Sequence, residues 1–375
     1  MNARTIVMDA AGELSTRAVP VPELGPGALL VRVELTGICG TDVHMRRGGM
    51  ELPFPVVPGH ELAGTVEAVG GDGRTDATGD PLSTGDAVTV VPGYNAVEDW
   101  YTDRVPARPL ACTDRTVYGL RSVEEYPHLH GGMSQFLVVE RDAHCYRLPD
   151  DLDVELGALV EPLSVATHAL DTAAAPGLPW IREGFGIGQS VAVQGAGPIG
   201  LLTMAAASTA GAGQVIALDR LDERLGLARE FGATDLVNVD AHDDDDALVA
   251  AVNEATSSGD GPDVVVEAVG HPSAFEQSIE LVRKAGTVVE VGHYAAAGEA
   301  SIDPSTLVHR ELSVRGSLAY LPNQFETAIS MLHRTGDRFP YRDLFNYRVG
   351  LDDATAAYDA QAEGRAYRAT IHPWE

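Results

Sequence analysis

The chain has 375 residues, 45% of them hydrophobic, and carries 55 acidic against 26 basic residues, which gives a formal net charge of -29. This length favours two domains, and the charge argues against nucleic acid as a partner, because phosphate binding requires the opposite sign. No apolar run approaches the roughly 18 residues of a membrane helix, and residues 1–20 lack the charged and apolar regions of a signal peptide, so we expect a cytoplasmic protein without a membrane partner.

The acidic residues are spread over the whole chain, with one dense run at 243–246. Two interpretations are open. The acids could form a surface that faces a cationic partner, or a uniformly acidic surface that keeps the protein soluble in concentrated salt, where charge repulsion is screened within about 3 Å at 1 M. The scatter favours the second interpretation, and we predict a halophilic source.

The first 150 residues predict a β-rich segment. Short apolar runs, such as 28–35 and 87–91, alternate with Gly/Pro turns. Residues 71–86 and 93–130 are polar and irregular, and we expect surface excursions there. Over residues 153–175 the apolar side chains recur at helical spacing, which predicts a helix.

From residue 190 to residue 291, predicted strands and helices alternate along the chain. This alternation is typical of a doubly wound parallel sheet, and the predicted fold class is therefore α/β. The expected strands are 190–194, 214–218, 236–239, 264–267 and 287–291, and the expected helices are 201–210, 221–231, 246–255 and 274–281. The last stretch, 311–375, contains a strand-like run at 312–315 and two expected helices, 324–334 and 352–361.

A glycine-rich turn, Gly195-Ala196-Gly197-Pro198-Ile199-Gly200, follows the first of these strands and opens a helix. In such a motif Gly195 permits the tight turn, Gly197 lets the backbone approach a pyrophosphate, and Gly200 lets the helix pack closely on the strand. The N–H groups of the helix N-terminus then face the phosphates. The spacing alone is weak, but the flanking strand and helix supply the required context.

The next strand ends at Asp219, 19 residues after Gly200. A carboxylate at this point accepts hydrogen bonds from the adenosine ribose hydroxyls and repels a 2′-phosphate, so the sequence favours NAD over NADP as cofactor. Arg220 is adjacent and could soften that preference, which keeps NADP open.

Metal-ligand residue types gather in three short segments. The residues are Cys39 in the first segment, His60 and Glu61 in the second, and Glu161 at the start of the long predicted helix. A thiolate, an imidazole and carboxylates are the ligand types of a zinc site.

At this point the chain resembles the zinc-containing medium-chain dehydrogenases, on the branch that includes sorbitol, threonine and archaeal sugar dehydrogenases. Gly59–Gly64, continuing to Gly70, is similar to the family's GHExxG zinc signature, Ser83–Val88 to its S/P-x-G-D-x-V strand, and Gly37–Asp42 to its GICGTD segment. The resemblance covers essentially the whole chain.

The resemblance implies a GroES-like β-rich catalytic domain over 1–163 and 311–375, and a Rossmann NAD-binding domain over 164–310. It also implies a homodimer or homotetramer.

The resemblance implies specific roles for the metal residues. Cys39 and His60 would bind one catalytic zinc, with Glu61 or Glu161 as a further ligand. Asp42 would orient the ligand histidine.

Catalysis would also use Thr41 and His44, which are similar to the proton relay of the family. The zinc would acidify the alcohol, as it does water, and the resulting zinc alkoxide would expel hydride toward NAD. Thr41 would accept the alcohol proton and pass it to His44. Glu61 would serve as a neighbouring carboxylate that binds or displaces the metal.

Two departures from the family pattern stand out. Many relatives hold a structural zinc with four cysteines, whereas residues 92–130 here keep only Cys112, so we expect no structural zinc. His128 and His130 nearby could be metal ligands, but surface histidines are the favoured interpretation. Residues 173–189 form an unusually long connection into the first Rossmann strand.

The sequence thus predicts oxidation of a secondary alcohol, with Glu161 rather than Cys favouring a polyol or sugar. The alternatives within enzymes are an L-threonine-type amino-alcohol dehydrogenase and an NADP-using glucose dehydrogenase. A zinc-free quinone-type reductase or a non-catalytic dinucleotide-binding protein is the distant alternative, since both lack the Cys and His ligands found here.

Overall fold

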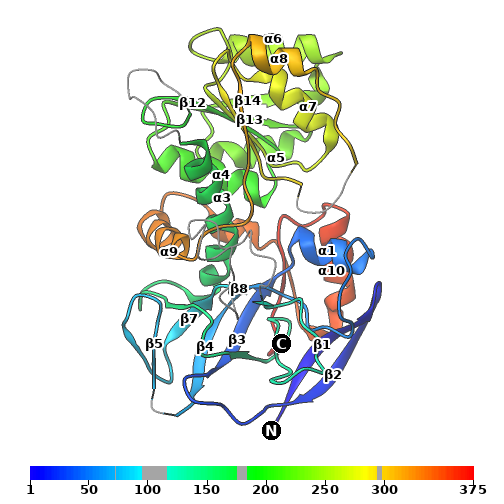
Figure 1. Ribbon diagram of the computed structural model, residues 1–375, viewed down its shortest axis with the longest axis vertical. Coiled ribbons are helices and arrows are strands. Elements are labelled where there is room, and N and C mark those ends of the chain that lie inside the picture. Colours follow the sequence, from blue (N-terminus) through cyan, green and yellow to red (C-terminus); the bar gives the residue numbers. More distant parts are fainter. Residues whose placement is uncertain (72, 95–115, 175–183, 294–297) are drawn as a thin grey trace. The chain divides into compact units, whose positions relative to one another are not determined.

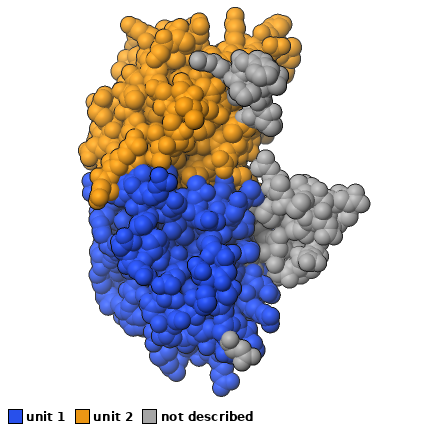
Figure 2. Space-filling model, turned by 90° about the vertical axis from the view of Figure 1, so that its left-hand side faces the viewer, with its two compact units in different colours: residues 1–161, 321–336, 341–375 blue, residues 162–320, 337–340 orange. Residues whose placement is uncertain are grey.

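The computed structural model describes residues 1–71, 73–94, 116–174, 184–293 and 298–375. Internal contacts divide the chain into two units, coloured separately in Figure 2. Unit 1 comprises Met1–Glu161, Leu321–Gly336 and Tyr341–Glu375, and unit 2 comprises Pro162–Tyr320 and Asp337–Pro340.

Unit 1 is β-rich. In its described part, a seven-stranded sheet has the order β11-β7-β4-β3-β19-β18, and β10 also pairs with β3. Strands β7, β4 and β3 of this sheet are labelled in Figure 1. The strands of unit 1 are β1 Asn2–Ala10, β2 Glu13–Pro20, β3 Leu29–Gly37, β4 Glu61–Val69, β5 Arg74–Thr75, β6 Pro81–Leu82, β7 Ala87–Val90, β8 Gly93–Tyr94, β9 Thr116–Val117, β10 Phe136–Val139, β11 Cys145–Arg147, β18 Tyr347–Val349 and β19 Ala369–Ile371.

The helices of unit 1 are mostly short. The helical segments are α1 Gly40–Arg46, η2 Val154–Leu159, α9 Gln324–Thr335, η4 Tyr341–Leu344, η5 Leu351–Asp353 and α10 Ala354–Ala362, and α3 Val160–Ala173 begins in unit 1 and continues in unit 2.

Strand β3 shows how the sequence builds this unit. Its alternate residues Leu29, Val31 and Val33 enter one buried cluster, while Leu30 enters another. This follows from the period of two in a β-strand, which sends successive side chains to opposite faces. Both faces of β3 are therefore covered, and its partner β19 brings residues near the C-terminus beside it.

Unit 2 holds a parallel sheet of six strands in its described part, with the order β14-β13-β12-β15-β16-β17. Strand β15 is buried throughout, as expected where helices cover both faces of a parallel sheet. The elements of unit 2 after α3 are β12 Ser190–Gln194, α4 Pro198–Thr209, β13 Gln214–Asp219, α5 Asp222–Glu230, β14 Asp235–Asn238, η3 Val239–Ala241, α6 Asp245–Ala255, β15 Val264–Glu267, α7 Pro272–Leu281, β16 Thr287–Glu290, α8 Pro304–His309 and β17 Ser313–Gly316.

The strand order places a reversal between β12 and β15, because the chain runs outward from β12 to β14 and then crosses back to β15. In open parallel sheets a ligand crevice forms at the carboxyl ends of the strands at such a reversal. The glycine-rich turn after β12 lies at this position.

Three local features differ from the sequence expectations. The helix expected over 153–175 is a 3₁₀ helix, η2, followed by α3. Helix α1 was not expected, because its seven residues are too few to show a period. Residues 311–320 belong to unit 2, whereas the resemblance placed 311–375 with the β-rich domain, because β17 pairs with β16.

In the described part of the chain no helix combines the length and apolarity needed to cross a bilayer.

Candidate metal and dinucleotide sites

Helix α1 fixes the position of Cys39. The Cys39 residue caps the helix N-terminus, and its backbone N–H donates to Asp42 Oδ2 at 2.9 Å. Asp42 is fully buried, and its other oxygen accepts a longer hydrogen bond, 3.4 Å, from the N–H of Gly59. One carboxylate thus ties together the two segments that carry Cys39 and His60.

The side chains of Cys39, His60 and Glu61 converge, with one ligand-type atom from each lying within 4.8 Å of the others. His60 and Glu61 are only 9% and 1% exposed. A buried thiol, imidazole and carboxylate at this spacing form a donor set that fits zinc.

The electrostatics of this site are governed by its acids. Burial lowers the pKa of His60, but attraction to Asp42, with smaller contributions from Cys39 and Glu161, outweighs it and raises that pKa well above 6.5. His60 Nδ1 lies 3.9 Å from Asp42 Oδ1, beyond hydrogen-bond distance. Asp42 therefore acts on His60 through its charge in this structure.

Arg368 is a residue of the site that sequence reasoning missed. Its Nη1 lies 2.6 Å from Glu61 Oε1, and the two side chains are 3% and 2% exposed. Burial lowers the pKa of Arg368, yet the charge of Glu61 more than compensates and raises it. For Glu61, burial raises the pKa while Arg368 opposes the rise. The guanidinium thus stays charged and holds this carboxyl in place.

Glu161 stands apart from the three converging ligand atoms. It is the second residue of α3 and is 8% exposed. Its charge contributes to the raised pKa values of both His60 and Arg368. Glu161 is therefore part of the same electrostatic environment.

Thr41 and His44 lie on α1 at positions i and i+3, so they share one face of the helix. Thr41 Oγ1 is 3.8 Å from the Cys39 sulfur, and both Thr41 and His44 are half-buried. The hydroxyl is thus placed next to the metal-type cluster, with the imidazole one helical turn further along.

In unit 2 the glycine-rich turn has the backbone geometry that its sequence predicts. Gly195 has a φ of +91°, which favours glycine, and a Cβ at Gly200 would lie 1.7 Å from the Gly195 carbonyl oxygen. A Cβ at Gly197 would meet nothing within 4 Å, so the space in front of it is open. Pro198 is the first residue of α4, and the free N–H groups of Ile199 and Gly200 follow it.

Asp219 ends β13 and faces this turn. Its Oδ2 accepts from the Ala196 N–H at 2.8 Å, and its Oδ1 accepts from the Leu221 N–H at 3.0 Å. A carboxylate offers about four acceptor positions, so Asp219 retains capacity for ribose hydroxyls. Arg220 instead forms an exposed ion pair with Asp240, with Nε 2.8 Å from Oδ1.

A second cluster of ligand-type side chains, which sequence reasoning also missed, lies at the carboxyl ends of β15 and β16. It consists of Glu267, Glu290 and His293, with atoms within 4.8 Å of one another. The one sequence signal for this cluster is that Glu267 and Glu290 each lie at or next to the end of a predicted strand.

The segment that follows β9 departs from expectation. Tyr118, Leu129 and His130 are fully buried, so both ends of residues 118–130 enter the core, while residues 124–126 are exposed as expected, and His130 is not a surface histidine. The His130 Nε2 lies 3.0 Å from the Glu125 carbonyl, and burial lowers its pKa to about 4. His128 is half-buried. Cys112, and with it the expectation about a structural zinc, lies outside the described residues, as does much of the 173–189 connection.

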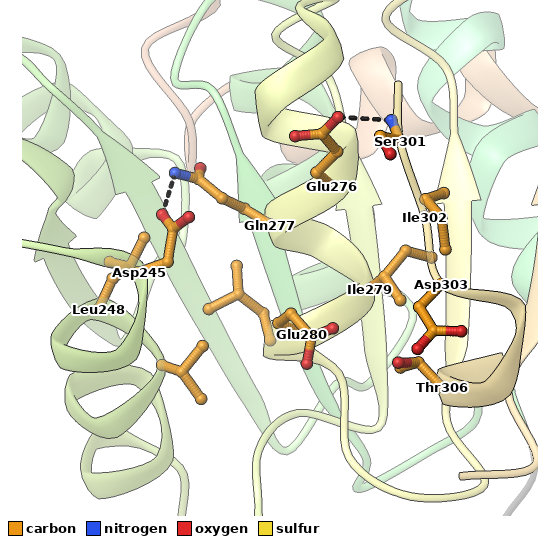
Figure 3. A pocket seen from close by; sticks show the side chains of 12 residues that line it. Asp245, Leu248, Glu276, Gln277, Ile279, Glu280, Ser301, Ile302, Asp303 and Thr306 are labelled. Atoms are coloured by element: carbon orange, nitrogen blue, oxygen red, sulfur yellow. Dashed lines mark hydrogen bonds between the residues drawn. The ribbon is translucent and has the colours of Figure 1, made fainter. Parts of the chain in front are cut away.

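A pocket of about 200 Å³ lies between α6, α7 and the segment that leads into α8 (Figure 3). Its acids already have partners: Asp245 accepts from Gln277 at 2.8 Å, and Glu276 accepts from the Ser301 N–H at 2.6 Å. The residues that line this pocket include none from the Cys39 cluster, the glycine-rich turn or the Glu267 cluster.

Two family models match the chain. Residues 25–150 match the model of the alcohol dehydrogenase GroES-like domain, and residues 198–334 match that of the zinc-binding dehydrogenases. The chain is 31% identical to 5-exo-hydroxycamphor dehydrogenase of Pseudomonas putida, over 98% of each chain, and 32% identical to sorbitol dehydrogenase of Homo sapiens, over 97% of this chain and 94% of that one.

A solved structure extends the comparison. A zinc-binding dehydrogenase from Sinorhizobium meliloti, bound to NADP, superposes with a TM-score of 0.86 at 30% identity, over 100% of both chains. The predicted fold class, a GroES-like domain with a Rossmann domain, is confirmed. The chain therefore belongs to the zinc-dependent medium-chain dehydrogenase family, whose members are oxidoreductases that act on alcohols.

Proposed function

We propose that this protein oxidises a secondary alcohol, a polyol or sugar, with NAD as hydride acceptor. The convergence of Cys39, His60 and Glu61 beside Thr41 carries the proposal, because it joins a zinc-type donor set to a hydroxyl that can take a proton. The similarity to sorbitol dehydrogenase and the presence of Glu161, where alcohol dehydrogenases carry a cysteine, support a polyol or sugar.

Cys39 and His60 would hold one catalytic zinc, with Glu61 or Glu161 as the further ligand. When bound there, zinc supplies a Lewis acid that lowers the pKa of an alcohol hydroxyl. Arg368 keeps Glu61 oriented through their buried ion pair. Asp42 fixes the backbone of Cys39 and places negative charge beside His60.

Thr41 would accept the proton of the alcohol, because its hydroxyl both accepts and donates hydrogen bonds. His44, on the same face of α1 and half-buried, would receive that proton and exchange it with solvent. An imidazole suits this role because one ring nitrogen can accept a proton while the other donates one.

The preference for NAD is supported by two observations at the end of β13. The Asp219 carboxylate, held by the Ala196 and Leu221 N–H groups, would accept from ribose hydroxyls and repel a 2′-phosphate. Arg220, the residue that could attract the phosphate, is already paired with Asp240. The NADP found in the Sinorhizobium structure is the reason to measure both cofactors.

The test is a turnover screen of the purified protein with NAD and NADP, against polyols, sugars, simple secondary alcohols and threonine, at low and high salt. We expect the highest kcat/KM with a polyol or sugar and NAD. Faster turnover of threonine than of any polyol or sugar would refute the proposed substrate class. Faster turnover with NADP than with NAD would refute the proposed cofactor.

We further propose a homodimer or homotetramer. Strand β17 is one edge of the parallel sheet, and Val314 on it and Leu318 just beyond are 40% and 42% exposed. The backbone N–H and C=O groups of an edge strand can pair with a second copy, and these two apolar side chains would be covered by it. Light scattering at high salt should give a multiple of the 39.6 kDa chain mass, and a monomer would refute this assignment.

A further inference from the structure

The Glu267 cluster, formed by Glu267, Glu290 and His293, lies beside the reversal of strand order in unit 2. Glu267 ends β15 and pairs in register with Glu290, which ends β16. Glu267 also pairs in register with Gln194, the last residue of β12 before the glycine-rich turn. Glu267 is fully buried, while the side chains of Glu290 and His293 are 19% and 22% exposed.

The hydrogen bonds of the cluster leave one donor missing. Glu267 Oε1 accepts from the N–H groups of Val269 and Gly270, at 2.7 and 2.9 Å. Glu290 Oε1 accepts from the His293 N–H at 3.1 Å and lies 3.0 Å from His293 Nδ1. Glu290 Oε2 is buried and, within the described residues, has no donor.

A proton shared with Glu267 would supply that donor. Carboxyl oxygens of Glu267 and Glu290 lie within 4.8 Å of each other, and two ionised carboxylates at this spacing repel each other and cannot donate to one another. Burial, followed by the neighbouring Glu290, raises the pKa of Glu267 to about 8. A divalent cation would need both carboxyls ionised, whereas the burial of Glu267 and the missing donor at Glu290 Oε2 favour a proton between them.

Few other charges face the pair. His293 Nδ1 lies 3.6 Å from Glu267 Oε2 and closer to Glu290. In the part of the chain that the structure describes, these two carboxylates form no ion pair with Arg or Lys. In this part of the chain, the imidazole and a shared proton are the groups that would relieve their mutual repulsion.

The turn held by Glu267 packs directly on the glycine-rich turn. The Ala268 N–H donates to the Gln194 carbonyl at 3.0 Å, and a Cβ at Gly195 would lie 3.1 Å from the Val269 side chain. On its other side, a Cβ at Gly292 would lie only 2.3 Å from the Gly270 nitrogen. A shift of residues 268–270 would therefore displace the backbone on which the dinucleotide would rest.

We propose that Glu267 is a positioning residue for the dinucleotide, and that the proton it shares with Glu290 holds the 268–270 turn in its binding position. This inference rests on the proposed dinucleotide site and adds a pH dependence to it. Loss of the proton leaves two negative charges within 4.8 Å of each other, which pushes the turn away from Gly195 and weakens binding.

The direction and size of the effect follow from the raised pKa of Glu267, about 8. A group with a raised pKa makes its full contribution below its ordinary value and loses it as the pH rises through the raised value. The cluster is about nine-tenths protonated at pH 7 and about one-tenth at pH 9. If only the protonated form binds, the Kd for NADH rises about tenfold between these pH values.

The test is the Kd for NADH, measured by fluorescence titration of the zinc-loaded full chain from pH 6.5 to 9.5 at constant high salt. Glu267→Gln supplies an oxygen to Val269 and Gly270 and an amide donor to Glu290 at every pH. We expect its Kd to lie within about twofold of the unmodified protein at pH 7 and to change less than about threefold by pH 9. Glu254→Gln, which removes an exposed carboxylate from α6, is the matched control and should keep the tenfold rise.

Glu290→Gln provides a second variant, because its amide would donate to Glu267 and remove the repulsion, and it should flatten the profile in the same way even if Glu267→Gln fails to fold. A Kd that rises equally in the unmodified protein and in both variants would overturn the role of the shared proton. Failure of every protein to bind NADH would instead refute the proposed cofactor.

Discussion

The buried pair of Arg368 and Glu61 predicts a large loss of stability when one partner is removed. In Arg368→Met, Glu61 would remain 1% exposed without its cation. Breaking a buried ion pair in this way costs about 3–5 kcal/mol. For a unit of this size each kcal/mol lowers Tm by about 2–4 °C, so Tm should fall by at least about 6 °C.

The assay is thermal unfolding of chelator-treated protein at high salt, so that no metal compensates for Glu61. The exposed pair of Arg4 and Asp352, at 2.6 Å, gives the matched control: Arg4→Met should cost less than about 1 kcal/mol. Adding Glu61→Gln to Arg368→Met should restore most of the loss, because it removes the unpaired charge. A single variant as stable as the control, or a double variant as unstable as the single, would refute this reasoning.

Three further predictions concern the relay, the cofactor and the salt dependence. Thr41→Ala should lower kcat about 100-fold while Thr41→Ser keeps most activity, and His44→Gln should cost less and respond to added imidazole; a zinc-loaded Thr41→Ala enzyme with normal kcat would contradict the relay. Asp219→Gly should raise kcat/KM with NADP relative to NAD, because it removes repulsion of the 2′-phosphate, and an unchanged ratio would remove Asp219 from cofactor choice. The net charge of -29 predicts that Tm rises steeply between about 0.1 and 1 M KCl, as the Debye length falls from about 10 to 3 Å, and a flat Tm in differential scanning calorimetry would end the halophile interpretation.

Much of unit 2 could be predicted from the sequence because its signals are local. A buried apolar run, a glycine turn and an amphipathic helix each fall within about 20 residues, and the structure places strands β12 and β15 where the sequence predicted them. The same holds for Cys39, His60 and Glu61, which lie in short segments whose residue types indicate zinc.

What the sequence could not indicate depends on contacts between distant segments. Arg368 reaches Glu61 across 307 positions because β19 pairs with β3, and no local pattern marks that pairing. The Glu267 cluster requires knowing that β15 and β16 are neighbours in register. His130 illustrates the opposite error, since a polar residue in an irregular segment was expected at the surface and is fully buried.

The most direct test of the central claim measures zinc and turnover in the same samples. We predict about one zinc per chain, together with oxidation of a polyol or sugar by NAD, and loss of both in Cys39→Ser. Cys145, a thiol that is 1% exposed and lies in β11, gives the control, and Cys145→Ala should keep both. An unmodified protein that oxidises alcohols without zinc, or a Cys39→Ser protein that retains its zinc and its activity, would contradict the account.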